Sequence, residues 1–252
     1  MCYDTEEKLE EKMEDRKIYN REEMIIGPKG LEKLWQSHVM VLGLGGVGGS
    51  AFEALLRSGI GEITVVDNDV VDETNLNRQA LARLSSIGKK KTDVAQMMRD
   101  DISPRIQVHA VEAFVLPENL PELFERKPDF VIDCIDTVST KIALAVFCEQ
   151  AGIPLVSCMG TGNKMHPEML KIADLYETRV CPLCRVMRRE LKNRGVKHLR
   201  VCYSEEKPIS TGERTPGSIA FVPPVAGLIL AGEAVRYLLK ERGKTYGDNE
   251  SL

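Results

Sequence analysis

The chain has 252 residues, of which 43% are apolar and 29% charged, and its formal net charge is −4. These values are typical of an ordinary globular protein and exclude collagen-like, fibrous and disordered chains. The negative balance also excludes a broad electrostatic affinity for nucleic acid, so any such contact needs a local basic patch. An acidic start without an apolar leader, together with seven scattered cysteines, favours a reducing cytoplasm.

The predicted elements begin after an acidic N-terminal extension, residues 1–18. Residues 19–35 end in a short helix that carries Leu31, Leu34 and Trp35 on one side. Several apolar strands then alternate with helices, and they are expected at 38–45, 62–69, 106–114, 129–137 and 153–160. Some of these strands are apolar on both faces, which predicts a Rossmann-like α/β fold: a mostly parallel sheet with helices on both faces.

The pattern changes after Gly162. The expected elements are strands at 169–175 and 199–204, a helix at 182–195, a loop rich in Pro, Gly, Ser and Thr at 205–218, and a closing helix at roughly 223–242. We expect these strands to extend the sheet in an antiparallel sense. The prediction is therefore one domain over 19–252, with a nucleotide-binding half at about 37–162 and a substrate and tRNA-side half at about 163–243.

The closing helix contains the most apolar stretch of the chain, IAFVPPVAGLILAG (219–232). This stretch is interrupted by Pro223 and Pro224 and followed by Glu233 and Arg236. It falls short of the ~20 uncharged residues that a membrane helix needs. We therefore expect a buried helix and no membrane partner.

A glycine-rich turn, GLGGVGG (43–49), joins the first strand to a helix. Gly43, Gly45 and Gly48 fit the pattern G-x-G-x-x-G, whose glycines permit the turn, the approach of backbone to phosphate, and the packing of helix on strand. The N-terminus of the helix then offers free N–H groups to an anion. Asp67 ends the second strand, where an acid binds the ribose of either NAD or ATP.

Charged residues beyond this turn favour ATP over NAD. Arg78 and the lysines Lys89, Lys90 and Lys91 supply more cations than a dinucleotide needs, and they suit a triphosphate. Asp136 follows the fourth strand, at the edge where ligands of such sheets bind, and a lone carboxylate there suits Mg²⁺. The alternatives are that the lysines form a solvated helix start and that Asp136 caps the next helix.

The motifs GLGGVGG, VVDNDVVDETNLNRQ (65–79), GKKK (88–91) and DCIDT (133–137) resemble those of the ThiF/MoeB/HesA family, which uses ATP to adenylylate a carboxylate. The resemblance implies ribose binding by Asp67, Mg²⁺ binding by Asp136, and a homodimer in which Arg21 reaches the phosphates of the partner subunit. The residues implied to bind the nucleotide are Gly43, Gly45, Gly46, Gly48, Asp67, Asp69, Asn75, Arg78 and Lys91. Among them, Asn75, Arg78 and Lys91 would bind the phosphates. The residues implied to be catalytic are Arg78, Lys91, Asp136 and Arg21.

The second half, from SCMGTGNKMHP (157–167) to TPGSIAFVPPVAGLILAGEAV (215–235), closely resembles the TcdA subfamily, the ATP-dependent tRNA threonylcarbamoyladenosine dehydratases. This resemblance implies cyclisation of N6-threonylcarbamoyladenosine beside the anticodon of tRNA, with adenylylation of the threonyl carboxylate and net loss of water. It leaves open a monovalent cation and a sulfur-relay protein as further components.

One CxxC pair, Cys181 and Cys184, stands at the start of the helix expected at 182–195. Structural zinc needs four ligands, so one pair is half of a site. Without a second pair, we expect two free thiols rather than zinc.

The same helix is strongly basic: residues 179–200 contain eight Lys or Arg and a single acid. Leu183, Met187 and Leu191 would form an apolar stripe, opposite a ridge made of Arg185, Arg188, Arg189 and Lys192. We expect this ridge to meet tRNA phosphates; the alternative is a merely solvated helix face. Tyr176 and Tyr203 are the nearest aromatic residues that could stack on bases.

Two other functions remain compatible with the sequence. An enzyme that activates the C-terminal Gly-Gly of a small sulfur-carrier protein would use the same ATP site, although the second CxxC pair common in that branch is missing. An NAD(P)-dependent oxidoreductase or a non-catalytic nucleotide-binding scaffold would use the glycine turn but would not depend on Arg78 or Asp136.

Overall fold

The computed structural model describes residues 17–240. The acidic extension therefore lies outside the described residues up to position 16, as does the predicted end of the last helix beyond position 240. Within 17–240 the chain forms one seven-stranded sheet in the order β3-β2-β1-β4-β5-β7-β6. The strands are β1 His38–Leu42, β2 Glu62–Val66, β3 Gln107–Val111, β4 Phe130–Asp133, β5 Leu155–Cys158, β6 Leu170–Asp174 and β7 Arg200–Ser204.

The sheet is parallel except at one edge. The register pairs Val39 of β1 with Ile63 of β2 and with Phe130 of β4, in parallel on both sides. The expected antiparallel extension occurs between β6 and β7, whereas β7 itself joins β5 in parallel. The mostly parallel fold with an antiparallel addition is therefore confirmed, and β7 enters the sheet between two strands that precede it in sequence.

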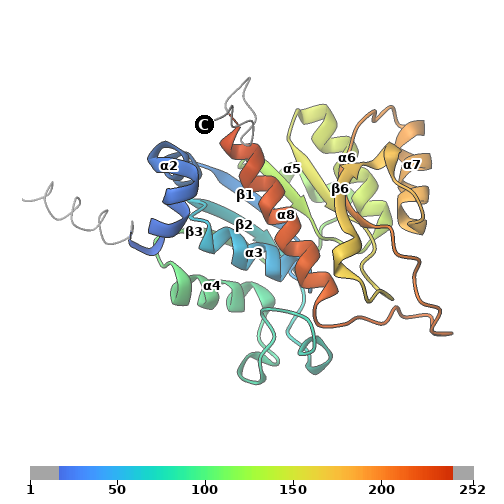
Figure 1. Ribbon diagram of the computed structural model, residues 1–252, viewed down its shortest axis with the longest axis horizontal. Coiled ribbons are helices and arrows are strands. Elements are labelled where there is room, and N and C mark those ends of the chain that lie inside the picture. Colours follow the sequence, from blue (N-terminus) through green and yellow to red (C-terminus); the bar gives the residue numbers. More distant parts are fainter. Residues whose placement is uncertain (1–16, 241–252) are drawn as a thin grey trace, which may run out of the picture.

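Helices cover both faces of the sheet (Figure 1). They are α2 Asn20–Trp35, α3 Gly48–Arg57, α4 Lys91–Ile102, α5 Leu120–Leu123, α6 Val138–Ala151, α7 Pro182–Asn193 and α8 Val222–Leu239. Short 3₁₀ turns occur at Glu73–Asn75, Leu84–Ser86, Pro117–Asn119, Pro167–Met169 and Leu175–Glu177. Alternation along β1 divides the core: Val39 and Val41 pack with α2, α3 and α8, whereas Met40 and Leu42 pack with α5 and α6.

The helix α8 crosses the central strands and packs tightly on α3 (Figure 1). At the crossing, a Cβ on Gly227 would lie 2.2 Å from the backbone oxygen of Val47, so only glycine fits. Among the described residues, α8 is the one helix that is long and apolar enough to span a membrane, but half of it is buried within the protein. This packing is that of a core helix, as expected from the sequence.

Candidate nucleotide-binding site

The glycine turn lies between the carboxyl end of β1 and the start of α3. Gly43 has a φ of +90°, a left-handed conformation that glycine adopts without strain. A Cβ on Gly48 would lie 1.7 Å from the backbone oxygen of Gly43, so the helix can approach the strand only through glycine. In front of Gly45 there is open space, and no described side chain caps the first turn of α3. The turn can therefore present backbone N–H groups to a phosphate.

Asp67 is fixed to this turn by its carboxylate. One oxygen accepts the N–H of Leu44 at 2.6 Å and the other accepts the N–H of Asp69 at 2.8 Å, while the residue is only 9% exposed. Each carboxylate oxygen has a second lone pair, so both can still accept a bond from a ribose hydroxyl. Asp67 can therefore accept bonds from a ribose, and its role in binding one stays a prediction.

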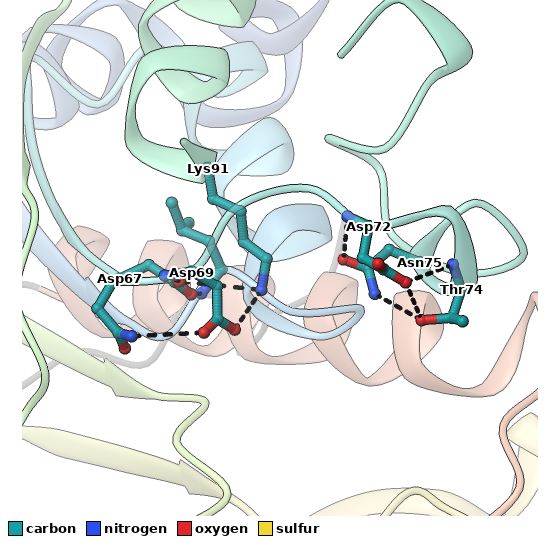
Figure 2. A network of polar contacts seen from close by, with 8 residues as sticks. Asp67, Asp69, Asp72, Thr74, Asn75 and Lys91 are labelled. Carbon is teal, nitrogen blue, oxygen red and sulfur yellow. Dashed lines mark hydrogen bonds and ion pairs between the residues drawn. The ribbon is translucent and has the colours of Figure 1, made fainter. Parts of the chain in front are cut away.

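Lys91, the first residue of α4, points toward the same acids (Figure 2). Its Nζ lies 2.8 Å from Asp69 Oδ2 and 3.8 Å from Asp67 Oδ1, and the side chain is almost fully buried. Lys90 differs: its Nζ binds Glu112 at 2.6 Å on the surface. Lys90 and Lys91 therefore point in different directions, as consecutive side chains at a helix start do, and of these two only Lys91 lies beside the acids of the site.

Arg78 also reaches the glycine turn. Its Cγ would lie 3.4 Å from a Cβ on Gly46, and its Nη1 donates to the backbone oxygen of Thr74 at 2.7 Å and to Asn77 Oδ1 at 2.8 Å. Asn75 has local partners instead: its Oδ1 accepts the N–H of Asp72 at 3.2 Å and closes a short turn (Figure 2). The structure thus brings Arg78 to the turn, while Asn75 shapes the segment that carries Arg78.

Asp136 is exposed, in the turn that follows β4. This turn contacts the glycine turn directly, since a Cβ on Gly43 would lie 3.0 Å from the backbone oxygen of Cys134. In the described part of the chain, no three His, Cys, Asp or Glu side chains are grouped to hold a metal ion. One exposed carboxylate fits Mg²⁺ that is bound mainly by phosphate oxygens and water.

A buried polar cluster behind this turn was not anticipated from the sequence. Lys141 of α6 donates from Nζ to Asp133 Oδ2 at 2.8 Å and to Ser157 Oγ at 3.2 Å, and Ser157 donates to the same carboxylate oxygen. The other oxygen of Asp133 accepts the N–H of Ile135 at 3.0 Å. The available signal was Lys141 itself, a lone cation directly before the apolar run IALAV (142–146).

Arg21 is exposed near the start of α2, far from its own glycine turn. The preceding Tyr19 binds the backbone oxygen of Leu56 at 3.2 Å, which places it at the C-terminal end of α3. The glycine turn is at the other end of α3, roughly 15 Å away for a helix of this length. Arg21 is thus at the opposite edge of the sheet from the site that its own chain builds.

The basic helix α7 has the expected apolar stripe: Met187 and Leu191 are buried and Leu183 packs beside them. Arg185, Arg189 and Lys192 are exposed. Arg188 differs from the expectation, because its Nη1 donates to the backbone oxygen of Thr178 at 2.9 Å and also binds the Thr178 hydroxyl. It is half-buried and holds the segment before α7, so the exposed ridge consists of the other three residues.

Cys181 and Cys184 are both buried, at the first turn of α7. A hydrogen bond from the Cys184 thiol, helped by backbone N–H groups, lowers the pKa of Cys181 to about 6 against the opposing effect of burial. The same contact raises the pKa of Cys184. Cys181 is therefore the more acidic thiol of the pair, as favoured at a helix N-terminus.

Of the two tyrosines considered for base stacking, Tyr203 is 2% exposed and is therefore not available on the surface. Tyr176 is half-buried, and its hydroxyl donates to the backbone oxygen of Val196. Phe221 is 42% exposed and directly precedes α8, whose Pro223 lies against the glycine turn. Nothing in the local sequence indicates that the side chain of Phe221, at the start of a helix, is exposed to solvent.

The family model of the ThiF family matches residues 19–250 of this chain. The match includes the glycine turn and the acid, the buried lysine and the arginine around it. The chain belongs to the ThiF family. Among ThiF relatives, the tRNA threonylcarbamoyladenosine dehydratase of Bacillus subtilis (strain 168) is 42% identical over 88% of this chain and 95% of its own length. That of Escherichia coli (strain K12) is 38% identical over 67% of this chain and 63% of its own length.

A solved structure shows the same ThiF fold. The E. coli tRNA N6-threonylcarbamoyladenosine dehydratase, TcdA, in complex with ATP superposes with a TM-score of 0.83 at 32% identity, covering 89% of this chain and 94% of that one. The expected α/β fold and family are therefore confirmed over nearly the whole chain.

Proposed function

We propose that this protein is an ATP-dependent tRNA threonylcarbamoyladenosine dehydratase, which cyclises N6-threonylcarbamoyladenosine beside the anticodon. The main support is the conjunction of a glycine turn, Asp67, Lys91 and Arg78 in one site with a similarity that covers 88% of this chain and 95% of a relative of that name. The two halves of the domain, about 37–162 and about 163–243, would then serve the nucleotide and the tRNA respectively.

The site residues have distinct roles in this proposal. The glycine turn, with Gly46 in contact with Arg78, holds the phosphates together with Arg78 and Lys91, and Asp67 holds the ribose. Asn75 shapes the segment before Arg78. Asp69 holds Lys91 in place until phosphate oxygens replace Asp69 as the partner of this lysine. Asp136 would hold Mg²⁺, which neutralises phosphate charge when bound.

The reaction needs no protein nucleophile. The threonyl carboxylate attacks the α-phosphorus of ATP, and pyrophosphate leaves. A nucleophilic atom of the carbamoyl group of the substrate then attacks the activated carbonyl, and AMP leaves with the former carboxylate oxygen. The product has lost one water, and ATP has become AMP and pyrophosphate. Arg78 and Lys91 stabilise the charge that develops on the phosphates.

Nucleoside mass spectrometry tests this proposal. Threonylcarbamoylated tRNA is incubated with the protein, with and without Mg-ATP, and the modified nucleoside is expected to lose the mass of one water only when ATP is present. The matched control, Arg78→Ala, should bind tRNA but leave the nucleoside unchanged. An unchanged nucleoside with the wild-type protein, together with AMP transfer to the Gly-Gly end of a sulfur-carrier protein, would support the alternative function instead.

A homodimer is part of the proposal because Arg21 cannot reach the glycine turn of its own chain. Arg21→Ala and Arg78→Ala should each abolish activity in isolation. When the two variants are unfolded together and refolded, half of the dimers are mixed, and each mixed dimer contains one intact site. Activity should then return to about a quarter of wild type, by the symmetry of a two-fold dimer. Absence of recovery, or a monomer by light scattering, would contradict the dimer.

The exposed ridge of α7, Arg185, Arg189 and Lys192, is proposed to contact tRNA phosphates, with Arg188 supporting it from within the fold. An enzyme that acts on tRNA is expected in the cytoplasm, in agreement with free buried thiols.

A further inference from the structure

The loop between β7 and α8, residues 205–221, is held by one residue from a distant turn. Asn163 lies beyond the carboxyl end of β5 and has a φ of +57°, a left-handed conformation that asparagine tolerates better than most residues. Its backbone N–H donates to the oxygen of Gly217 at 2.8 Å, and its side-chain Oδ1 accepts the N–H of Gly217 at 2.6 Å. Its backbone oxygen accepts the N–H of Ile209 at 2.8 Å. Asn163 thus binds both arms of the loop, the first at Ile209 and the second at Gly217, and these contacts form the base of the loop.

Neighbouring contacts make the base rigid. The Glu206 carboxylate accepts the N–H groups of Met165 at 2.9 Å and His166 at 3.0 Å, and Lys164 donates to the backbone oxygen of Glu206 at 2.6 Å. Gly162 packs so closely that a Cβ there would lie 2.8 Å from Pro216. The residues beyond this base, 210–216, are all exposed, so the fold orders a loop whose own side chains face solvent.

The second arm of the loop leads directly to the nucleotide site. Asn77, which precedes Arg78, donates from Nδ2 to the backbone oxygen of Ser218 at 3.0 Å. Farther along, a Cβ on Gly46 of the glycine turn would lie 3.0 Å from Pro223. The loop therefore spans the carboxyl edge of the sheet from the turn after β5 to the glycine turn, and exposed Phe221 lies on this arm.

The chemistry of the loop suits a single-stranded RNA segment. Two of its acids are engaged at the base, Glu205 with Lys171 and Glu206 with backbone N–H groups. Beyond them, positions 207–216 carry two cations and one acid, Lys207 and Arg214 against Glu213, together with the hydroxyls of Ser210, Thr211 and Thr215. Hydroxyls and cations bind phosphate and ribose, and an exposed aromatic such as Phe221 offers a face on which an unstacked base can stack. A protein partner would need an apolar patch, whereas this loop exposes only Ile209 and Phe221 among its large apolar residues.

We propose that loop 205–221 is a preformed surface for the anticodon loop of the tRNA substrate, and that Asn163 is the positioning residue that holds it beside the nucleotide site. This inference rests on the proposed function for the identity of the RNA. The order of the loop before the RNA arrives reduces the entropy that is lost on binding.

The test compares wild type with Asn163→Gly and Asn163→Asp. Glycine keeps the left-handed backbone and removes the side-chain acceptor, whereas aspartate keeps an oxygen at the position of Oδ1. The dissociation constant for a fluorescent anticodon stem-loop is measured by anisotropy, and that for ATP by calorimetry. Asn163→Gly should weaken RNA binding by about fivefold, the effect of one lost hydrogen bond, and leave ATP binding unchanged. Asn163→Asp should bind RNA within about twofold of wild type.

Hydrogen exchange at the Gly217 amide gives a second readout, since this N–H should exchange faster in Asn163→Gly while amides in β1 and β4 do not change. Unchanged RNA binding in Asn163→Gly despite a freed Gly217 amide, or an equal loss of ATP binding, would overturn the inference. The nucleoside assay on wild type is separate: a wild-type protein that binds the RNA but does not dehydrate it contradicts the proposed function and leaves the binding comparison valid.

Discussion

Two lysine–aspartate pairs lie near the carboxyl edge of the sheet, and they differ in the exposure of the acid. In the pair that follows β2, the side chain of Lys91 is 4% exposed and that of its partner Asp69 is 58% exposed. In the pair at the end of β4, the side chains of Lys141 and Asp133 are 2% and 1% exposed, and Ser157 completes their hydrogen bonds. Both lysines bind an aspartate oxygen at 2.8 Å, so distance alone does not distinguish them.

The difference indicates which lysine is available to a ligand. Asp69 can turn toward water at little cost, so phosphate oxygens can take its place on Lys91. Asp133 cannot, because a buried carboxylate without its cation carries a large desolvation penalty. We therefore infer that Lys91 is a ligand-binding lysine and that Lys141 is a structural one, although both lysines are buried and bind an aspartate at the same distance.

The largest expected effect is on stability, from Lys141→Met. This change leaves Asp133 buried and unpaired, and the free energy of unfolding should fall by about 3–5 kcal/mol. Urea denaturation measures it. The double variant Asp133→Asn, Lys141→Met removes both charges and should recover part of the loss. If the single variant is as stable as wild type, the pair is not what holds the turn after β4.

The next effect is on catalysis, from Lys91→Met. Removing a cation that stabilises charge in the transition state should lower kcat by about 10²–10³-fold. The free energy of unfolding should fall by no more than about 1 kcal/mol, since Asp69 returns to water and Asp67 keeps its two backbone bonds. Pyrophosphate release and urea denaturation provide the two measurements. A stability loss equal to that of Lys141→Met would remove the distinction between the two pairs.

The smallest effect concerns a third carboxylate, Glu206, which is held by backbone N–H groups. Burial raises the pKa of Glu206, but the N–H groups of Met165 and His166, with the charges of His166 and Lys164, outweigh burial and bring its pKa below the ordinary value of 4.5. Since the pKa is lower in the folded state, Glu206 stabilises the fold above pH 4.5, and this contribution is lost as the pH falls through the folded pKa.

Glu206→Gln should therefore lower the free energy of unfolding at neutral pH by about 1–2 kcal/mol, the effect of a charged hydrogen bond. The difference from wild type should shrink in acid, because wild-type Glu206 then becomes protonated as well. Urea denaturation across pH measures this, with Glu213→Gln, an exposed acid of the same loop, as the matched control. A difference that stays constant with pH would show that the carboxylate charge does not hold the loop.

Local sequence predicted the alternation of strands and helices well, but it placed the strand ends too late. The first strand was expected at 38–45 and ends at Leu42; the second was expected at 62–69 and ends at Val66. The residues in excess, such as Asp67 and Asp69, form the turns that build the site. A change from apolar to polar residues, such as that at Asp67, does not by itself end a strand, so the boundary depends on where neighbouring strands stop pairing.

The sequence by itself determined the family of folds, the glycine turn and the residues around it, because these depend on short-range patterns: apolar periodicity, glycines that permit close approach, and a motif of fixed spacing. Tertiary structure alone decided the rest. It separated Lys90 from Lys91, turned Arg188 into the fold, paired Lys141 with Asp133 and Ser157, and joined Asn163 to Gly217 across 54 positions. Each of these outcomes depends on which distant group lies within about 3 Å of a polar atom, a condition that spacing along the chain does not encode.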